Sequence, residues 1–100
     1  MTTDREAGWQ KFLYLCQQCE NTMQLTELLD LLFTLEEKEQ LAMRVLLIEE
    51  LLDGKKTQRQ MAHDLGLSVA KITRGSNALK IISSKLRDFL AITLLKSPEN

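Results

Sequence analysis

The sequence has few of the residues that mark secreted, membrane or metal-binding proteins. Proline occurs once, at Pro98, histidine once, at His63, and cysteine twice, while glycine occurs four times in 100 residues. No apolar run is long enough to span a membrane, and the first twenty residues lack the continuous apolar segment of a secretion signal. We therefore expect a cytoplasmic protein that has no membrane partner.

The two cysteines, Cys16 and Cys19, form a single C-x-x-C in a helical pattern. A zinc site needs four ligands, and this pair with one histidine does not supply them within one chain. We expect no metal and no cofactor, and we interpret both cysteines as reduced and structural. An enzyme is not expected either, because His63 stands without a nucleophile, a carboxylate pair or a glycine-rich phosphate loop. His63 is expected at the surface.

The length and the charge distribution indicate the class of partner. One hundred residues with no internal repeat or linker make a single domain, 1–100, whose core is marginal unless a partner chain adds burial. The net charge of −1 hides an asymmetry. Residues 1–54 hold four basic and eleven acidic residues, whereas residues 55–87 hold eight basic residues and one acidic residue. A basic block of this kind attracts polyphosphate, and nucleic acid is the expected partner.

The stretch 58–80 has the pattern of a helix-turn-helix. Thr57 and Gln60 are spaced as a capping box that opens a short first helix. Gly66 suits the left-handed conformation of a sharp turn, because a Cβ is penalised there. Ser68 is a plausible N-cap for the second helix. We expect the motif to extend over residues 57–82.

Side chains within the motif support this interpretation. The small Ala62 suits a close helix crossing, and Leu67 after the turn is expected to be buried. In the second helix the apolar residues are Ala70, Ile72 and Leu79, and the residues that remain available outward are Val69, Lys71, Thr73, Arg74, Asn77 and Lys80. The alternative is an ordinary helical hairpin with a solvated basic face.

The rest of the chain is also helical in pattern, which predicts an all-α fold. Thr34 and Glu37 form a second capping box, and Gly54 closes the helix that follows it. The expected elements are a flexible arm over 1–6, dimerisation helices within 7–53 (7–21, 23–33 and about 35–53), and a C-terminal helix over 84–97.

The helix before Gly54 has no polar face across its middle. Its apolar residues are Leu41, Ala42, Met43, Val45, Leu46, Leu47, Ile48, Leu51 and Leu52. A helix that is apolar all round must be buried all round, and one hundred residues can hardly surround it. We therefore predict a homodimer whose core is shared between the chains.

Two arginines in these helices lack a local partner. Neither Arg44 nor Arg74 has a carboxylate three or four residues away on its helix. One hypothesis is that both side chains reach solvent or a phosphate. The other is that they converge on a flat anionic ligand, because guanidinium pairs with carboxylates and stacks on aromatic faces.

Several strings of residues resemble the tryptophan repressor family of bacteria. The most specific are Ile72-Thr73-Arg74-Gly75-Ser76-Asn77 and the upstream Glu49-Glu50-Leu51-Leu52, and Thr34, Arg44-Val45, Gln58-Arg59 and Leu94-Leu95-Lys96-Ser97 agree with them. The resemblance runs without obvious gaps from about Trp9 to Ser97. It implies an all-α, intertwined homodimer of six helices per chain, which binds L-tryptophan as corepressor and then operator DNA of tryptophan biosynthesis or uptake genes.

The resemblance also implies roles for individual residues. Arg44 and Arg74 would sandwich the indole ring, Arg74 and the Thr34 hydroxyl would hold the ligand, and Gly75 would allow its close approach. Backbone carbonyls at Leu31 and Phe33 would meet the ammonium group. This chain has Ala78 where the family usually has a serine that contacts the amino group, and the change could weaken or relax ligand recognition. The residues expected at the DNA are Gln58, Arg59, Ser68, Val69, Ala70, Lys71, Thr73, Asn77 and Lys80.

Two other functions stay open on the sequence alone. One is a ligand-independent helix-turn-helix protein, for instance transposase-like, which would not need Arg44 within an apolar helix. The other is a helical interaction protein whose basic patch meets an acidic partner, with binding that is indifferent to DNA sequence.

Overall fold

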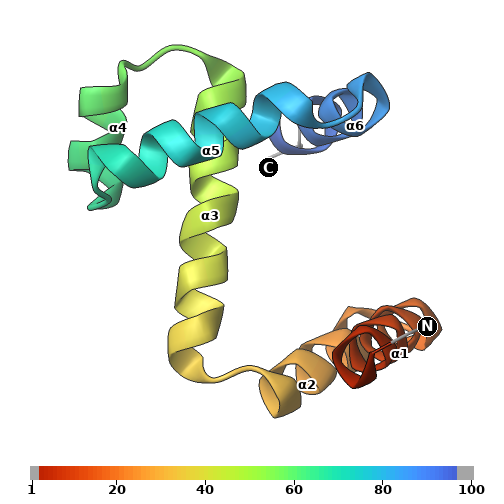
Figure 1. Ribbon diagram of the computed structural model, residues 1–100. Helices are drawn as coiled ribbons and strands as arrows, with labels where there is room; N and C mark the ends of the chain where they lie inside the picture. The colour runs from red at the N-terminus through yellow and green to blue at the C-terminus, as the bar shows by residue number, and fades with distance from the viewer. Residues whose placement is uncertain (1–2, 97–100) are drawn as a thin grey trace. The chain divides into compact units, whose positions relative to one another are not determined.

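A computed structural model describes residues 3–96 of the chain, and this part is helical without a β-strand. The six helices are α1 (Asp4–Gln18), α2 (Thr22–Leu32), α3 (Leu35–Asp53), α4 (Gln58–Leu65), α5 (Val69–Ile81) and α6 (Ser84–Leu95). The all-α, six-helix prediction is confirmed (Figure 1). Among the described residues, no helix is both long and apolar enough to cross a membrane.

The chain divides into two compact units, whose described parts are residues 3–38 and 39–96. The first unit holds α1, α2 and the opening turn of α3. Its aromatic rings pack together, with the Trp9 and Phe12 centroids 5.3 Å apart and those of Phe12 and Phe33 6.0 Å apart. No residue of α1 or α2 is fully buried within the single chain. The contact of Phe12 with Phe33 links α1 to the C-cap of α2.

The chain becomes helical earlier than the sequence pattern predicted. Residues 1–6 were expected to be a flexible arm, but α1 begins at Asp4, after the N-cap Thr3. The amide of Glu6 donates to Thr3 Oγ1 at 3.0 Å, and the amide of Thr3 donates to Glu6 Oε1 at 2.9 Å. This capping box satisfies two amides of the first turn, so residues 3–6 are ordered by local hydrogen bonds. Residues 1 and 2 of the expected arm lie outside the described residues.

The other helix ends agree with the predictions to within a few residues. Asn21 caps α2 by accepting from the amide of Gln24 at 2.8 Å. The Thr34 hydroxyl accepts from the amide of Glu37 at 3.1 Å, and Gly54 follows α3 with φ of 71°. The cap at Thr34 and the glycine at the end of the helix are as predicted. The predicted C-terminal helix ends at Leu95 here, and position 97 lies outside the described part of the chain.

The core of the second unit lies where three helices meet. Leu47 from α3, Met61 from α4 and Ile72 from α5 are buried together, and Ile72 is 0% exposed. The partly buried residues packed against them are Leu51, Ala62, Leu65 and Leu67. The expected packing roles of Ala62 and Leu67 are therefore confirmed. In Figure 1, α5 crosses α3 and lies beside α4.

Most of the apolar surface of α3 is not covered within the single chain. Only Leu47 is buried, whereas Leu41, Val45 and Leu46 are 45%, 44% and 43% exposed. The expectation that this helix is buried all round is therefore not met by one chain alone. The uncovered side chains form an apolar surface that monomeric proteins seldom leave in water.

At Gly75, α5 lies close against α3. A Cβ at this position would lie 2.9 Å from Leu47 Cδ2 and 3.5 Å from Leu51 Cδ1. The Leu47 side chain is buried and has little room to turn away. A side chain at position 75 would therefore force the two helices apart or displace Leu47.

Replacing two helical glycines by alanine should have opposite effects on stability. Gly75→Ala should cost about 1 kcal/mol net, because overpacking of about 1–3 kcal/mol outweighs the gain of about 1 kcal/mol in helix propensity. Gly8→Ala is the control, because open space surrounds Gly8 in α1 and alanine should stabilise by about 0.5–1 kcal/mol. Urea unfolding followed by circular dichroism measures both, and a stabilised Gly75→Ala variant would contradict the close packing at the α5–α3 crossing.

Candidate functional site

The helix-turn-helix begins with the capping box that the sequence predicted. The amide of Gln60 donates to Thr57 Oγ1 at 3.1 Å, and the amide of Thr57 donates to Gln60 Oε1 at 2.8 Å. Gln58 and Arg59 follow the cap as the first two residues of α4, and both are exposed. Their side chains thus project at a helix N-terminus, where the helix dipole favours phosphate oxygens.

The turn between α4 and α5 also has the expected geometry. Gly66 takes φ of 66° and ψ of 32°, which is the left-handed region, and the amide of Leu67 donates to the Ala62 carbonyl at 3.0 Å. Ser68 Oγ then accepts from the amide of Lys71 at 3.2 Å and caps α5. The turn is therefore held by backbone and capping hydrogen bonds rather than by a long loop.

The second helix of the motif, α5, has one buried side and one side that faces solvent. Ile72 and Leu79 are buried, in agreement with the pattern, whereas Ala70 is exposed. All nine residues predicted to face DNA are exposed: Gln58, Arg59, Ser68, Val69, Ala70, Lys71, Thr73, Asn77 and Lys80. The motif therefore presents these side chains to solvent and uses its apolar side for packing.

One hydrogen bond joins the two helices of the motif on this exposed side. Thr73 Oγ1 donates to Gln58 Oε1 at 3.2 Å, across fifteen positions of sequence. Sequence reasoning treated the two residues as independent contacts, because nothing in their spacing indicates that they meet. The bond fixes the Gln58 side chain against α5 and leaves its amide NH₂ group free to donate.

Arg44 and Arg74 are both exposed and have no protein partner in the described residues. Among residues 3–96, neither guanidinium forms an ion pair with a carboxylate or donates a hydrogen bond. This agrees with the absence of local carboxylates in the sequence. Each guanidinium keeps its full set of donors for an external anion.

The α3–α5 crossing places these two arginines in the same region of the second unit. Arg74 precedes Gly75, which meets Leu47, and Arg44 lies one helical turn before Leu47 on α3. The backbone positions of both arginines therefore lie within one helical turn of the Leu47–Gly75 contact. Ala78, one turn after Gly75, is exposed on α5.

The other residues expected at the ligand belong to the first unit. Thr34 is exposed and its hydroxyl accepts one hydrogen bond from its own capping box, which leaves the O–H free to donate. Leu31 is 79% exposed in the last turn of α2, and Phe33 is the C-cap of that helix. Carbonyls at a helix C-terminus lack partners within the helix and carry partial negative charge, which suits an ammonium group.

Lys56 and Arg87 of the basic block make close polar contacts within the protein. Lys56 Nζ lies 2.9 Å from Glu50 Oε2 and 2.8 Å from Asp64 Oδ2. Arg87 Nη1 donates to the Leu79 carbonyl at 2.9 Å. The interpretation of all eight basic residues as one phosphate-attracting block is therefore corrected, because the charge of Lys56 is already compensated.

The hydrogen bonds that Lys56 donates to the two carboxylates explain the direction of its pKa shift. Its contacts with Asp64 and then Glu50 raise the pKa of Lys56, and the same contact with Lys56, followed by that with His63, lowers the pKa of Asp64. Because the folded-state pKa of Asp64 lies below its unfolded value, its stabilising contribution is complete above about pH 4 and is lost as the pH falls further.

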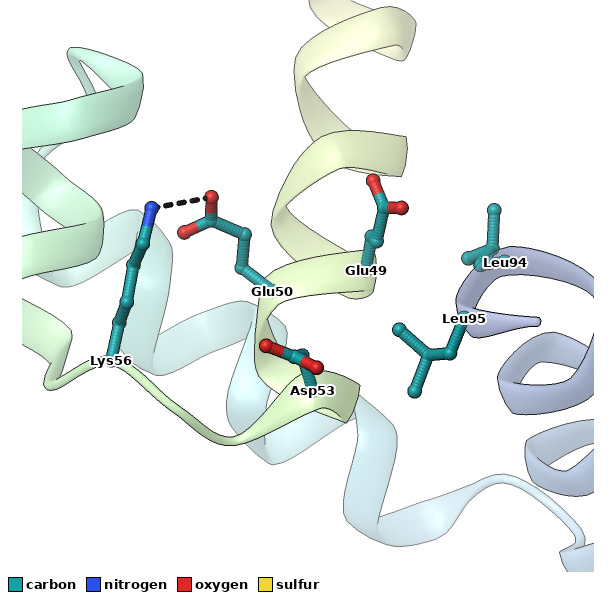
Figure 2. Close-up of a pocket in the computed structure, with 6 residues that line it drawn as sticks. All are labelled: Glu49, Glu50, Asp53, Lys56, Leu94 and Leu95. Atoms are coloured by element: carbon teal, nitrogen blue, oxygen red, sulfur yellow. Dashed lines mark hydrogen bonds and ion pairs between the residues drawn. The ribbon is translucent and has the colours of Figure 1, made fainter. Parts of the chain in front are cut away.

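A cavity of about 380 Å³ lies near this lysine, between the end of α3 and the end of α6. Figure 2 shows its lining of Glu49, Glu50, Asp53, Lys56, Leu94 and Leu95. None of the residues expected at the ligand or the DNA lines it. Within residues 3–96, moreover, no group of three or more His, Cys, Asp or Glu side chains is arranged to hold a metal ion.

Comparison of the sequence with known proteins identifies its family. Residues 7–94 match the family described as Trp repressor protein. A Trp operon repressor homolog of Chlamydia trachomatis serovar D is 41% identical over 90 residues, which cover 90% of this chain and 96% of that protein. Homologs of the same name from Vibrio cholerae and Photobacterium profundum are 41% and 38% identical, over 92% and 91% of this chain and 89% and 88% of theirs. The chain belongs to the Trp repressor family.

Proposed function

We propose that this chain is a repressor that binds L-tryptophan and, in the liganded state, binds operator DNA of tryptophan biosynthesis or uptake genes. Membership of the family makes it a helix-turn-helix transcription regulator and not an enzyme. The ligand and the operator are the proposed parts. The observation that carries them is a pair of exposed arginines without partners among the described residues, Arg44 and Arg74, each within one helical turn of the Leu47–Gly75 contact.

The chemistry of L-tryptophan suits the two arginines near the α3–α5 crossing. A carboxylate pairs with a guanidinium through two parallel hydrogen bonds, and the flat face of an indole ring stacks on a second guanidinium. Arg74 is proposed to stack on one face of the indole ring and to bind the carboxylate of the ligand. Arg44 is proposed to stack on the other face of the ring. The Thr34 hydroxyl and the carbonyls of Leu31 and Phe33 are the proposed partners for the polar end of the ligand.

The DNA contacts follow from the exposed side of the helix-turn-helix. Gln58 and Arg59 at the start of α4, with the amides near Ser68, are proposed to hold phosphates. Val69, Ala70, Lys71 and Thr73, at the start of α5, are proposed to face base edges in the major groove. Asn77 and Lys80 extend the contact along α5. A regulator of bacterial DNA would act in the cytoplasm.

A homodimer is proposed from the uncovered apolar surface. Leu41, Val45 and Leu46 on α3, with Phe89 and Ile92 on α6, are each between 43% and 59% exposed in the single chain. Covering such side chains stabilises by about 25 cal/mol per Å² of apolar area, and obligate homodimers bury large surfaces of this kind. A two-fold dimer would also present two recognition helices to DNA.

In the first experiment, the intact protein and the Arg74→Ala variant are each titrated with L-tryptophan in a calorimeter. We expect one site per chain in the intact protein and about tenfold to a hundredfold weaker binding in the variant, because a hydrogen bond to a charged group contributes about 1.5–3 kcal/mol. Lys80→Ala is the matched control, since it removes a cation from an exposed position of the same helix and should bind the ligand normally. Equal affinities for Arg74→Ala and the intact protein would rule out the arginine sandwich.

Restoring a hydroxyl at position 78 should sharpen ligand recognition. Ala78→Ser should bind L-tryptophan about twofold to tenfold more tightly, because a neutral hydrogen bond contributes about 0.5–1.5 kcal/mol. It should not change the affinity for indole-3-propionate, which lacks the amino group. Ala70→Ser adds the same hydroxyl to an exposed position of α5 on the proposed DNA face, and should leave both affinities unchanged. An equal gain for both ligands would show that the hydroxyl added by Ala78→Ser does not meet the amino group.

The dimer is tested by sedimentation velocity together with circular dichroism. The intact protein should sediment as a dimer and should unfold, rather than form a folded monomer, when it is diluted. Leu46→Asp should shift the dissociation to higher concentration because it places a charge in the shared core. Gln40→Asp, an exposed polar position of the same helix, is the control and should remain dimeric. A helical monomer at low concentration would overturn the shared core.

A further inference from the structure

Lys56 lies in the short connection between α3 and α4, residues 54–57, and contacts carboxylates from both helices. Its Nζ is 2.9 Å from Glu50 Oε2 in the last turn of α3, as Figure 2 shows, and 2.8 Å from Asp64 Oδ2 in the last turn of α4. Neighbouring Lys55 differs, because it is 81% exposed and its Nζ is 3.9 Å from Asp53. Lys56 thus bridges two helices, and Lys55 does not.

The Glu50 carboxylate depends on this bridge. Its side chain is only 24% exposed, and its Oε1 is buried without a hydrogen-bond partner among the described residues. Lys56 is the cation that compensates the charge through the other oxygen, Oε2. Removing one partner of a partly buried pair leaves an uncompensated charge, which destabilises more than the loss of an exposed pair. The contact at Glu50 is therefore sensitive to the loss of Lys56.

Asp64 has no favourable role in its own helix. A negative charge in the last turn of α4 opposes the helix dipole, so a neutral residue there would suit an isolated helix better. Its depressed pKa has Lys56 as the largest cause, and the ring of His63, 3.3 Å away and almost fully exposed, adds to it. The stabilising contribution of Asp64 thus comes mainly from the contact with Lys56.

Helix α4 needs such a support because it is short. It has eight residues, fewer than an isolated helix needs in water, and Met61 is its one fully buried residue. Ala62 and Leu65 add partial packing against the same core. The apolar contacts therefore fix one side of α4, and its orientation about that contact depends on polar groups elsewhere.

We infer that Lys56 is a positioning residue, which through Glu50 and Asp64 holds α4 at a fixed orientation to the end of α3. The Gln58 and Arg59 side chains at the start of α4 are thereby held in place for phosphate contacts, and this last step rests on the proposed function. Lys56 serves the DNA interface without touching DNA. Its own charge is used within the protein.

Amide hydrogen exchange of the full-length protein tests the bridge without DNA or ligand. Lys56→Met should speed exchange of the α4 amides by about threefold to tenfold, the effect expected for the loss of two partly exposed ion pairs. The amide of Ile72 in α5 should exchange at an unchanged rate. Lys56→Arg should restore most of the protection, and Lys55→Met, which removes the same charge from the neighbouring position, should have no effect. Unchanged exchange in α4 of Lys56→Met would overturn the inference.

Affinity for DNA provides a second test. When a carboxylate of the bridge is neutralised, the change in net charge predicts tighter binding, whereas the loss of positioning predicts weaker binding. The probe is the duplex that the intact protein selects from a random pool in the presence of L-tryptophan. Asp64→Asn removes a negative charge and would tighten DNA binding if only the overall charge mattered. If the bridge positions α4, Asp64→Asn and Glu50→Gln should each weaken binding by about threefold, as Lys56→Met does. Tighter binding by both carboxylate variants would refute the positioning role.

The two measurements separate this inference from the function on which it partly rests. If no duplex is selected, the proposed operator binding fails, while exchange of the α4 amides still decides whether Lys56 holds α4. If a duplex is selected and the α4 amides of Lys56→Met exchange as in the intact protein, the function stands and the bridge fails.

Discussion

The contact of Leu47 with Gly75 sets the geometry on which the rest of the second unit depends. Because glycine has no side chain, α5 approaches α3 until the Leu47 methyl group occupies the space of a Cβ. Ile72 is then fully buried beside Met61, and the opposite side of α5 is left in solvent. One close approach thus decides which residues of the recognition helix pack and which remain available for DNA.

Local rules made the boundaries of the helix-turn-helix predictable. A capping box, a left-handed glycine and a serine N-cap each depend on a few adjacent residues, so Thr57, Gly66 and Ser68 could be assigned from the sequence. The same rule applies to Thr3 and Glu6, where the polar composition of residues 1–6 favoured a flexible arm instead. The exposed positions of α5 were predictable for a similar reason, because the period of its apolar residues identifies the buried side.

Contacts between distant residues were not predictable from the sequence. The middle of α3 has no polar face, so its pattern could not single out Leu47 as the residue that packs within the chain. Glu50 and Asp64 lie six and eight positions from Lys56, on different helices, and only the fold brings them together. Counting charges along the sequence therefore assigned Lys56 to the phosphate-binding block. The Thr73–Gln58 hydrogen bond was missed for the same reason.

The position of the two free arginines suggests how a ligand would be coupled to DNA binding. Arg44 and Arg74 have like charges, lie within one helical turn of the Leu47–Gly75 contact, and are both exposed to solvent. An anion that pairs with both side chains would stabilise the arrangement of α3 and α5 to which it binds. Lys56 acts in the connection between α3 and α4, where its contacts with Glu50 and Asp64 are made within the protein and need no ligand. Under the proposed function, the ligand would therefore stabilise the α3–α5 arrangement, while the ion-pair bridge would hold α4 to the end of α3.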